Sequence, residues 1–105
     1  METVRVVFIS IPREDAAAFA RQIVEERLAA CANIVPKIES YYWWDGEINH
    51  DSESMLIIKT THEKFADLQA FILANHPYDV PELIGFPLKD ALPEYVAWVK
   101  NEVGE

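Results

Sequence analysis

The stretch ANIVPKIESYYWWDGEINHDSESMLII, residues 32–58, decides the fold of this chain. Residues 32–44 are rich in Ile, Val, Tyr and Trp, which are enriched in β-strands. Asp45 and Gly46 follow, and this dipeptide best accepts the positive φ angles of a tight hairpin turn. The chain returns through a polar stretch into residues 55–58, a continuous apolar run typical of a strand covered on both faces. The stretch therefore predicts a long antiparallel hairpin.

A helical pattern lies on each side of this hairpin. Before it, apolar side chains recur three or four residues apart over residues 16–28, and polar side chains occupy the opposite face. After it, Thr60 and Glu63 have the spacing of a capping box, and a second apolar stripe covers residues 65–72. Pro77 ends this second pattern. The sequence thus predicts two amphipathic helices, each with one buried face.

Two further strands and a short helix complete the pattern. Residues 3–11 and residues 83–88 read as strands, and residues 95–102 place apolar side chains on one face of a terminal helix. The order is β-α-β-β-α-β with a final helix. We therefore predict one α+β domain over residues 1–105, a ferredoxin-like sandwich with a four-stranded antiparallel sheet.

Topology and proline positions predict the strand order. The hairpin makes the second and third strands neighbours, and right-handed crossovers place the first strand beside the third. Pro36 lies in the second strand, while Pro81 and Pro87 border the fourth. Because proline lacks an N–H group, sheets tolerate it mainly at their edges. We expect strands one and three at the centre and strands two and four at the edges.

The strands carry more apolar surface than one chain can cover. Two helices cover only one face of a sheet, yet strands one, three and four are apolar on both faces. We therefore predict a closed homo-oligomer that buries the second face. The aromatic run at residues 41–44 is the natural contact arm, because aromatic residues dominate interface cores. The alternative is that these rings pack within their own chain.

Charge and composition exclude several classes of partner. The chain has 18 acidic and 9 basic residues and a net charge of −9, which disfavours nucleic acid and anionic lipid. No window contains the roughly 18 apolar residues that a membrane span requires. Cys31 is the one cysteine, so no internal disulfide forms and a reducing compartment is expected. Residues 1–5 resemble no export signal, and we predict a cytoplasmic protein.

The sequence predicts no enzyme and no required cofactor. It contains no G-x-S-x-G, H-E-x-x-H or P-loop motif. Small phosphatases of this fold class need a glycine-rich, anion-binding loop after the first strand. Here residues 10–15 contain Arg13, two carboxylates and no glycine.

Four ordered motifs resemble one known family. They are RLAACAN at residues 27–33, YYWWDG at 41–46, IKT at 58–60 and HPYDVPEL at 76–83. In order and spacing they resemble the CutA divalent-cation tolerance proteins over nearly the whole chain. The resemblance implies a homotrimer with Tyr41, Trp43 and Trp44 at its interface, similar in architecture to trimeric nitrogen-regulatory signalling proteins. It also implies a role in tolerance of copper and other divalent ions.

Two residues are candidate metal ligands. His76 ends the second helix just before a turn, and Cys31 matches a family cysteine that follows the first helix. The alternatives are a histidine interacting with the helix dipole and a buried thiol that serves packing. A copper-associated cysteine of the family is absent, since Ser10 and its neighbours occupy that region, and Asn75 replaces a second histidine of some relatives. We therefore expect weak binding of Cu²⁺ or another divalent cation.

A small-molecule cleft between subunits is the second hypothesis. Five side chains would line it, combining flat apolar surface, a cation, a carboxylate and hydroxyls: Tyr42, Trp44, Lys59, Glu63 and Tyr78. The alternative is interface packing with exposed charges. The leading functional prediction is a homotrimeric divalent-cation tolerance protein, and a trimeric signalling scaffold that binds a metabolite is the second.

Overall fold

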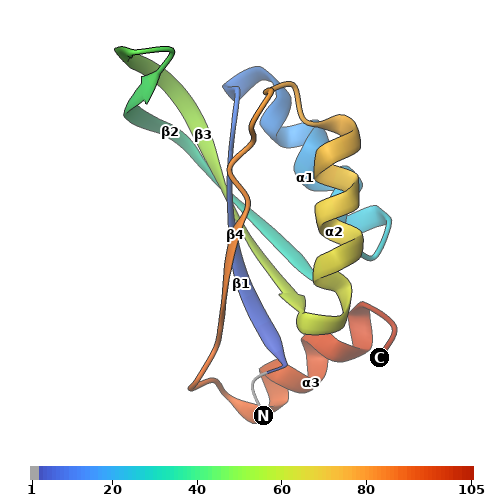
Figure 1. Ribbon diagram of the computed structural model, residues 1–105. Coiled ribbons are helices and arrows are strands. Elements are labelled where there is room, and N and C mark those ends of the chain that lie inside the picture. The colour runs from blue at the N-terminus through green and yellow to red at the C-terminus, as the bar shows by residue number, and fades with distance from the viewer. Residues whose placement is uncertain (1–2) are drawn as a thin grey trace.

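Figure 1 shows the computed structural model, which describes residues 3–105. The elements are β1 (Val4–Ile11), the 3-10 helix η1 (Arg13–Asp15), α1 (Ala16–Glu25), β2 (Cys31–Trp44), β3 (Glu47–Thr61), α2 (His62–Asn75), β4 (Ile84–Pro87) and α3 (Pro93–Glu102). The predicted α+β order with a terminal helix is confirmed. Met1 and Glu2, which belong to the N-terminal stretch used to predict a cytoplasmic protein, lie outside the described residues.

The four strands form one antiparallel sheet in the order β2-β3-β1-β4. β1 pairs with β3 on one side and with β4 on the other, so that Phe8 lies opposite both Ile57 and Ile84. The central and edge strands are therefore as predicted. Pro36 falls at an irregularity of register between Val35 and Ile38 of the edge strand β2, where a missing N–H interrupts no central ladder.

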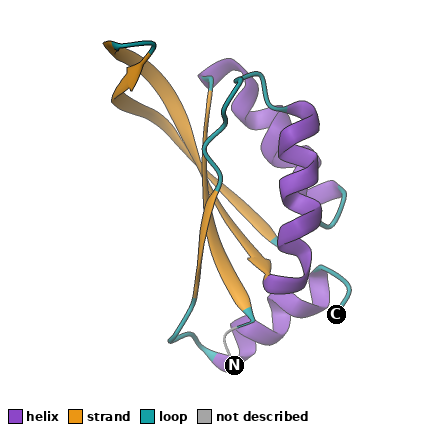
Figure 2. Ribbon diagram, viewed as in Figure 1, coloured by secondary structure: helices purple, strands orange, loops and turns teal. Residues whose placement is uncertain are grey.

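Both long helices cover the same face of the sheet (Figure 2). That face and the helices enclose the main core, whose fully buried members include Val7, Ile9, Leu56, Ile58, Ile23 and Leu68. Successive strand residues point to opposite faces, so these four β1 and β3 residues mark the helix-covered side. The other face is free of helices in the chain.

That helix-free face is apolar. Strand register places its seven apolar side chains together: Val6, Phe8, Val35, Met55, Ile57, Ile84 and Phe86. Phe8 and Phe86 meet edge to face, with ring centroids 5.5 Å apart. On β4, Ile84 is 52% exposed and Phe86 44%. We call this set the helix-free face.

α1 ends three residues earlier than its apolar pattern predicts. The helix stops at Glu25 because Arg27 adopts a left-handed conformation with φ 59°. The Leu28 N–H then bonds to the Ile23 carbonyl at 3.1 Å, and the Arg27 N–H bonds to that of Val24 at 3.0 Å. This is the Schellman pattern, which satisfies the last carbonyls of a helix while redirecting the chain. Leu28 still packs against the core, but from the turn.

The predicted capping box of α2 is wrong by one residue. β3 continues through Thr61, and the Thr61 hydroxyl, rather than that of Thr60, accepts from the Lys64 N–H at 3.3 Å. The N3 position is therefore Lys64, and Glu63 does not complete a box. Thr60 instead donates to the Leu28 carbonyl at 2.6 Å, which ties β3 to the end of α1. The strand continued because both threonines are fully buried.

Candidate functional site

A cleft of about 710 Å³ separates the hairpin from the irregular segment 77–82 that follows α2. Its walls come from the end of β1, from one face of the β2–β3 hairpin and from that segment. They consist of Ser10, Glu39, Ser40, Tyr41, Tyr42, Trp44, Glu53, Pro77, Tyr78, Asp79, Val80 and Glu82. We call it the hairpin cleft.

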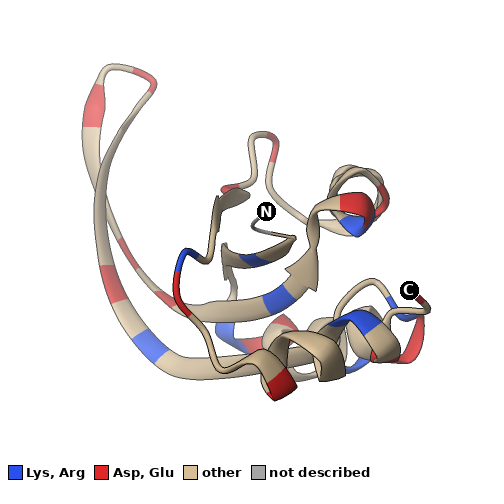
Figure 3. Ribbon diagram, turned by 90° about the horizontal axis from the view of Figure 1, so that it is seen from below, with Lys and Arg blue, Asp and Glu red and all other residues tan. Residues whose placement is uncertain are grey.

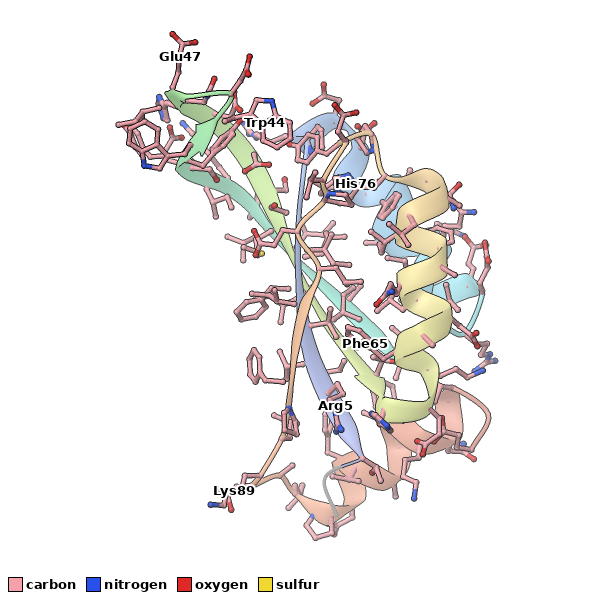
Figure 4. The ribbon with its side chains drawn as sticks, in the orientation of Figure 1. Arg5, Trp44, Glu47, Phe65, His76 and Lys89 are labelled. Carbon is pink, nitrogen blue, oxygen red and sulfur yellow. The ribbon has the colours of Figure 1, made fainter. Side chains whose placement is uncertain are left out.

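Strand alternation divides the four hairpin aromatics between two faces. Tyr42 and Trp44 share one face, and Trp44 lies on the side of the hairpin nearest His76 (Figure 4). Tyr41 and Trp43 share the opposite face, and each is 71% exposed. The turn between the strands is formed by Asp45 and Gly46, with φ 53° and 78°, as their sequence predicts. The rings of Tyr41 and Trp43 are therefore not packed within their own chain.

A tyrosine and a buried carboxylate join the two walls of the cleft. The Tyr78 hydroxyl donates to Glu53 Oε2 at 2.5 Å, and Glu53 is 6% exposed. Burial, followed by this hydrogen bond, raises the pKa of Tyr78 well above its ordinary value. The hydroxyl therefore stays protonated and remains a donor. Tyr42 likewise donates to Asp51, and this bond raises the pKa of Tyr42.

His76 braces the cleft through both ring nitrogens. Nδ1 accepts from the Tyr78 N–H at 3.1 Å, and Nε2 lies 2.8 Å from the Ser10 carbonyl oxygen. Because an amide can only donate and a carbonyl can only accept, the proton must sit on Nε2. The ring also packs against Phe19. Metal ligation by His76 would therefore break one of these two hydrogen bonds.

The two candidate metal ligands lie apart. Cys31 is level with Lys59, and through it with Val6, whereas His76 bonds to Ser10. Four residues of β1 separate these levels, about 13 Å at the rise of a strand. Within residues 3–105, no group of three or more His, Cys, Asp and Glu side chains could hold a metal ion. The chain on its own thus offers His76 and Cys31 as separate residues.

Three of the five predicted cleft residues line the hairpin cleft, and two do not. Tyr42, Trp44 and Tyr78 lie in its walls. Lys59 is six residues beyond Glu53 on β3, about 20 Å along the strand, and bonds to the Asn33 side chain. Glu63 lies further on, in the first turn of α2. The prediction that one chain unites all five is wrong, because β3 is long and separates its two ends.

The sequence reading missed the carboxylates of the cleft. Glu39, Glu53, Asp79 and Glu82 all line it. Ser10 donates to Glu82 at 3.2 Å and so fixes one of them. A signal for Glu53 existed, since a period of two from Met55 and Ile57 places it on the helix-free side of β3. Asp79 and Glu82 stand within the HPYDVPEL motif, which was used only for the resemblance.

On the outer face of the hairpin, Glu39 and His50 form a second polar pair. His50 Nε2 lies 2.6 Å from Glu39 Oε1, and this hydrogen bond is the main cause that lowers the pKa of Glu39. The His50 ring stacks on Tyr41 with centroids 4.3 Å apart. This pair is well exposed, so its contribution to stability is small.

Comparison with known proteins identifies the family. A model of the family described as CutA1 divalent ion tolerance protein matches residues 5–102. The chain belongs to this family. The divalent-cation tolerance protein CutA of Thermus thermophilus is 44% identical over 100 residues, covering 94% of this chain and 97% of that protein. Its crystal structure superposes with a TM-score of 0.92, covering 96% of this chain and 99% of that one.

Other CutA relatives are longer or differ in described location. The chloroplastic CutA 1 of Oryza sativa is 46% identical over 95% of this chain, but the chain spans only 57% of that protein's length. A structure described as PII-like protein CutA from Nostoc sp. PCC 7120 has a TM-score of 0.90 at 31% identity, covering 94% of this chain and 96% of that one. The names of relatives include both chloroplastic and periplasmic proteins. Within residues 3–105, no helix is long and apolar enough to span a membrane.

Proposed function

We propose that this CutA-family chain acts as a homotrimer in divalent-cation tolerance, responds to copper and other divalent ions, binds them weakly and catalyses no reaction. The observation that carries the assembly is the helix-free face, on which Ile84 and Phe86 are about half exposed. Large exposed apolar patches on small proteins mark interaction sites. The exposed rings of Tyr41 and Trp43 on the hairpin supply a second apolar surface, reached by an arm that extends beyond the sheet (Figure 1).

The energy available from this surface is sufficient for association. Burial of about 300 Å² per chain stabilises by about 7–8 kcal/mol at 25 cal/mol per Å². Association costs several kcal/mol in lost translational and rotational freedom, so the surplus depends on how well the surfaces fit. We propose that Trp44 contributes at the rim of the same contact, since it is 49% exposed in one chain.

Net charge supports the weak binding of cations. Each chain carries −9, so three would carry −27, which concentrates divalent cations near the surface. Acidic positions are spread along the hairpin and around the helices rather than gathered at one point (Figure 3). His76 and Cys31 remain the proposed softer ligands, and each would act with groups of a neighbouring chain. The lone cysteine is compatible with a reducing, cytoplasmic compartment.

Light scattering tests the assembly. The intact protein should have three times the 12.0 kDa mass of one chain at micromolar concentration. A Phe86→Asp variant places a charge on the helix-free face and should shift the mass toward that of a monomer. Leu73→Asp is the matched control, because Leu73 is 68% exposed on the outer side of α2. A folded wild-type monomer would refute the proposed assembly.

Calorimetric titration tests the metal ligands. Cu²⁺ and Zn²⁺ are titrated into the wild type, His76→Ala and Cys31→Ser. Weak, saturable binding that is reduced in a variant assigns that residue as a ligand. Isotherms identical to the wild type would exclude the substituted residue, and an absence of heat would refute metal binding.

A second candidate function is a small-ligand signalling scaffold. The observation in its favour is the hairpin cleft, whose volume of about 710 Å³ falls in the range of small-molecule sites. One relative is also described as PII-like. Lys59 and Glu63 would join this site only if a neighbouring chain brought them to it. Thermal stabilisation by a specific compound would support this function, since a ligand of the folded state raises the unfolding temperature.

A further inference from the structure

We propose that the hairpin cleft binds an organic ammonium ion that carries a flat apolar group. The ammonium would lie beside Glu53, and the apolar group would lie against Tyr42 and Trp44. This inference rests on the second candidate function, the small-ligand scaffold, and names the chemical class of its ligand.

The charges that line the cleft select a cation. Four carboxylates face it, from Glu39, Glu53, Asp79 and Glu82, and no lysine or arginine is among the lining residues. Glu39 is partly neutralised by Lys37, 3.6 Å away, and by the His50 ring. No basic side chain of residues 3–105 forms an ion pair with the other three. An anionic ligand would therefore meet uncompensated like charge in this cleft.

Glu53 is the strongest single argument for a cationic ligand. Its side chain is 94% shielded from water, given its 6% exposure, and it lines an open cleft rather than the closed core. The Tyr78 hydroxyl occupies one carboxylate oxygen, yet a neutral donor supplies no counter-charge. Burying a carboxylate without a cation is costly, and removing that cost requires a partner of positive charge. A primary ammonium supplies the charge and three hydrogen-bond donors.

The aromatic walls favour an organic cation over a bare metal ion. Tyr42, Trp44 and Tyr78 contribute ring surface to a cleft that also holds the carboxylates. Ring faces attract ammonium groups and stack on flat hydrocarbon, whereas a hydrated metal ion gains little from them. A divalent ion needs several converging oxygen ligands, and the described residues contain no such group of three.

The site is fixed before any ligand arrives. His76 holds the Tyr78 backbone through Nδ1, and Tyr78 in turn holds Glu53. Ser10, whose carbonyl binds His76, uses its hydroxyl to hold Glu82. These bonds link the end of β1, β3 and the segment 77–82 into one rigid set. Preorganisation of this kind reduces the entropy cost of binding.

Calorimetry with phenethylammonium as the probe tests the proposal. We expect one saturable site per chain in the intact protein and binding at least about tenfold weaker for neutral 2-phenylethanol, which has the same ring but no charge. Phenylacetate, an anion, should not bind. The Glu53→Gln variant keeps the shape and the Tyr78 bond but removes the charge, and should weaken phenethylammonium binding by about tenfold or more. Trp44→Leu should weaken phenethylammonium and 2-phenylethanol alike.

Glu63→Gln is the matched control. It removes one carboxylate from the start of α2, outside the cleft, and should leave the affinity unchanged. Equal affinity for the amine and the alcohol, an unchanged affinity of Glu53→Gln, or no saturable binding at millimolar probe would each overturn the proposal. A titration with Mg²⁺ that competes with the probe through Glu53 would also overturn it, in favour of a metal site.

Failure of this inference and failure of the proposed function are distinguishable. Light scattering on the same samples reports whether the homotrimer exists, and the Cu²⁺ and Zn²⁺ titrations report metal binding. A metal-binding trimer that ignores phenethylammonium would refute only the ligand class. A chain that binds phenethylammonium through Glu53 but stays a monomer would refute only the assembly.

Discussion

Adding one methyl group at Gly85 should destabilise the protein. Gly85 is the one β4 residue on the helix-covered side that α2 contacts so closely: a Cβ built there would lie 2.9 Å from Phe65 Cε1 and 3.3 Å from Val7 Cγ2. Carbon atoms pack at about 3.5–4.0 Å, so the Phe65 ring must move. The Gly85 backbone is not left-handed, so a Gly85→Ala variant adds crowding without backbone strain.

Two opposing terms set the magnitude for Gly85→Ala. Overpacking costs about 1–3 kcal/mol, whereas replacing glycine by alanine stabilises by about 0.4–1 kcal/mol through the unfolded chain. Crowding therefore wins, with a net loss of about 1 kcal/mol. For a chain of this length the unfolding temperature should fall by about 4–8 °C. Displacement of β4 should also loosen the helix-free face, since Ile84 and Phe86 flank Gly85.

Thermal unfolding at one fixed protein concentration measures the effect, because an assembly couples stability to concentration. The decisive comparison repeats Gly85→Ala in a Phe65→Leu background, where the clashing ring atom is gone. The substitution should cost less there, with a coupling of about 1 kcal/mol between the two sites. An unchanged or raised unfolding temperature for Gly85→Ala, or the same cost in both backgrounds, would refute the reasoning.

Three further predictions concern α2, the cleft and the hairpin. Thr61→Ala should destabilise by about 1 kcal/mol because the N-terminus of α2 loses its cap, Thr61→Ser should restore most of it, and denaturant unfolding that shows no loss would contradict this. Stability of the wild type should fall as the pH rises above 10.0, since Tyr78 ionises there only when unfolded. Tyr78→Phe should show a shallower fall in unfolding temperature between pH 10 and pH 12, and parallel curves would reject the assigned pKa shift. Trp43→Ala should leave the fold intact by circular dichroism but raise the dissociation constant of the assembly in sedimentation, and an unchanged constant would remove Trp43 from the interface.

The residue pattern predicted most of the fold because its signals are local or depend on simple topology. Period-two and helical spacing located the strands and helices, and Asp45 with Gly46 located the turn. Strand order followed because crossovers are right-handed and prolines avoid central strands. The errors lie at element ends, where the left-handed Arg27 stopped α1 and burial of Thr60 and Thr61 extended β3. Such ends depend on tertiary packing as much as on local preference.

The candidate site was only partly predictable from the sequence. Aromatic residues at 42, 44 and 78 were selected for their chemistry, and the structure brings them together. Glu53 was not selected, because a carboxylate in a polar stretch reads as solvent-exposed, and only the packing of the segment 77–82 against the hairpin buries it. His76 was selected for its imidazole, but the fold assigns that ring to two backbone groups.

The sequence by itself therefore determined the element order, the sheet topology and an excess of apolar strand surface, since these follow from spacing, turn chemistry and the net count of apolar residues. The tertiary structure alone decided which ends of the elements meet. It separated Lys59 from Tyr78 along β3 and placed a buried carboxylate opposite a tyrosine 25 residues away. Contacts between distant residues depend on how the sheet twists and the loops close, and no local pattern in the chain encodes that geometry.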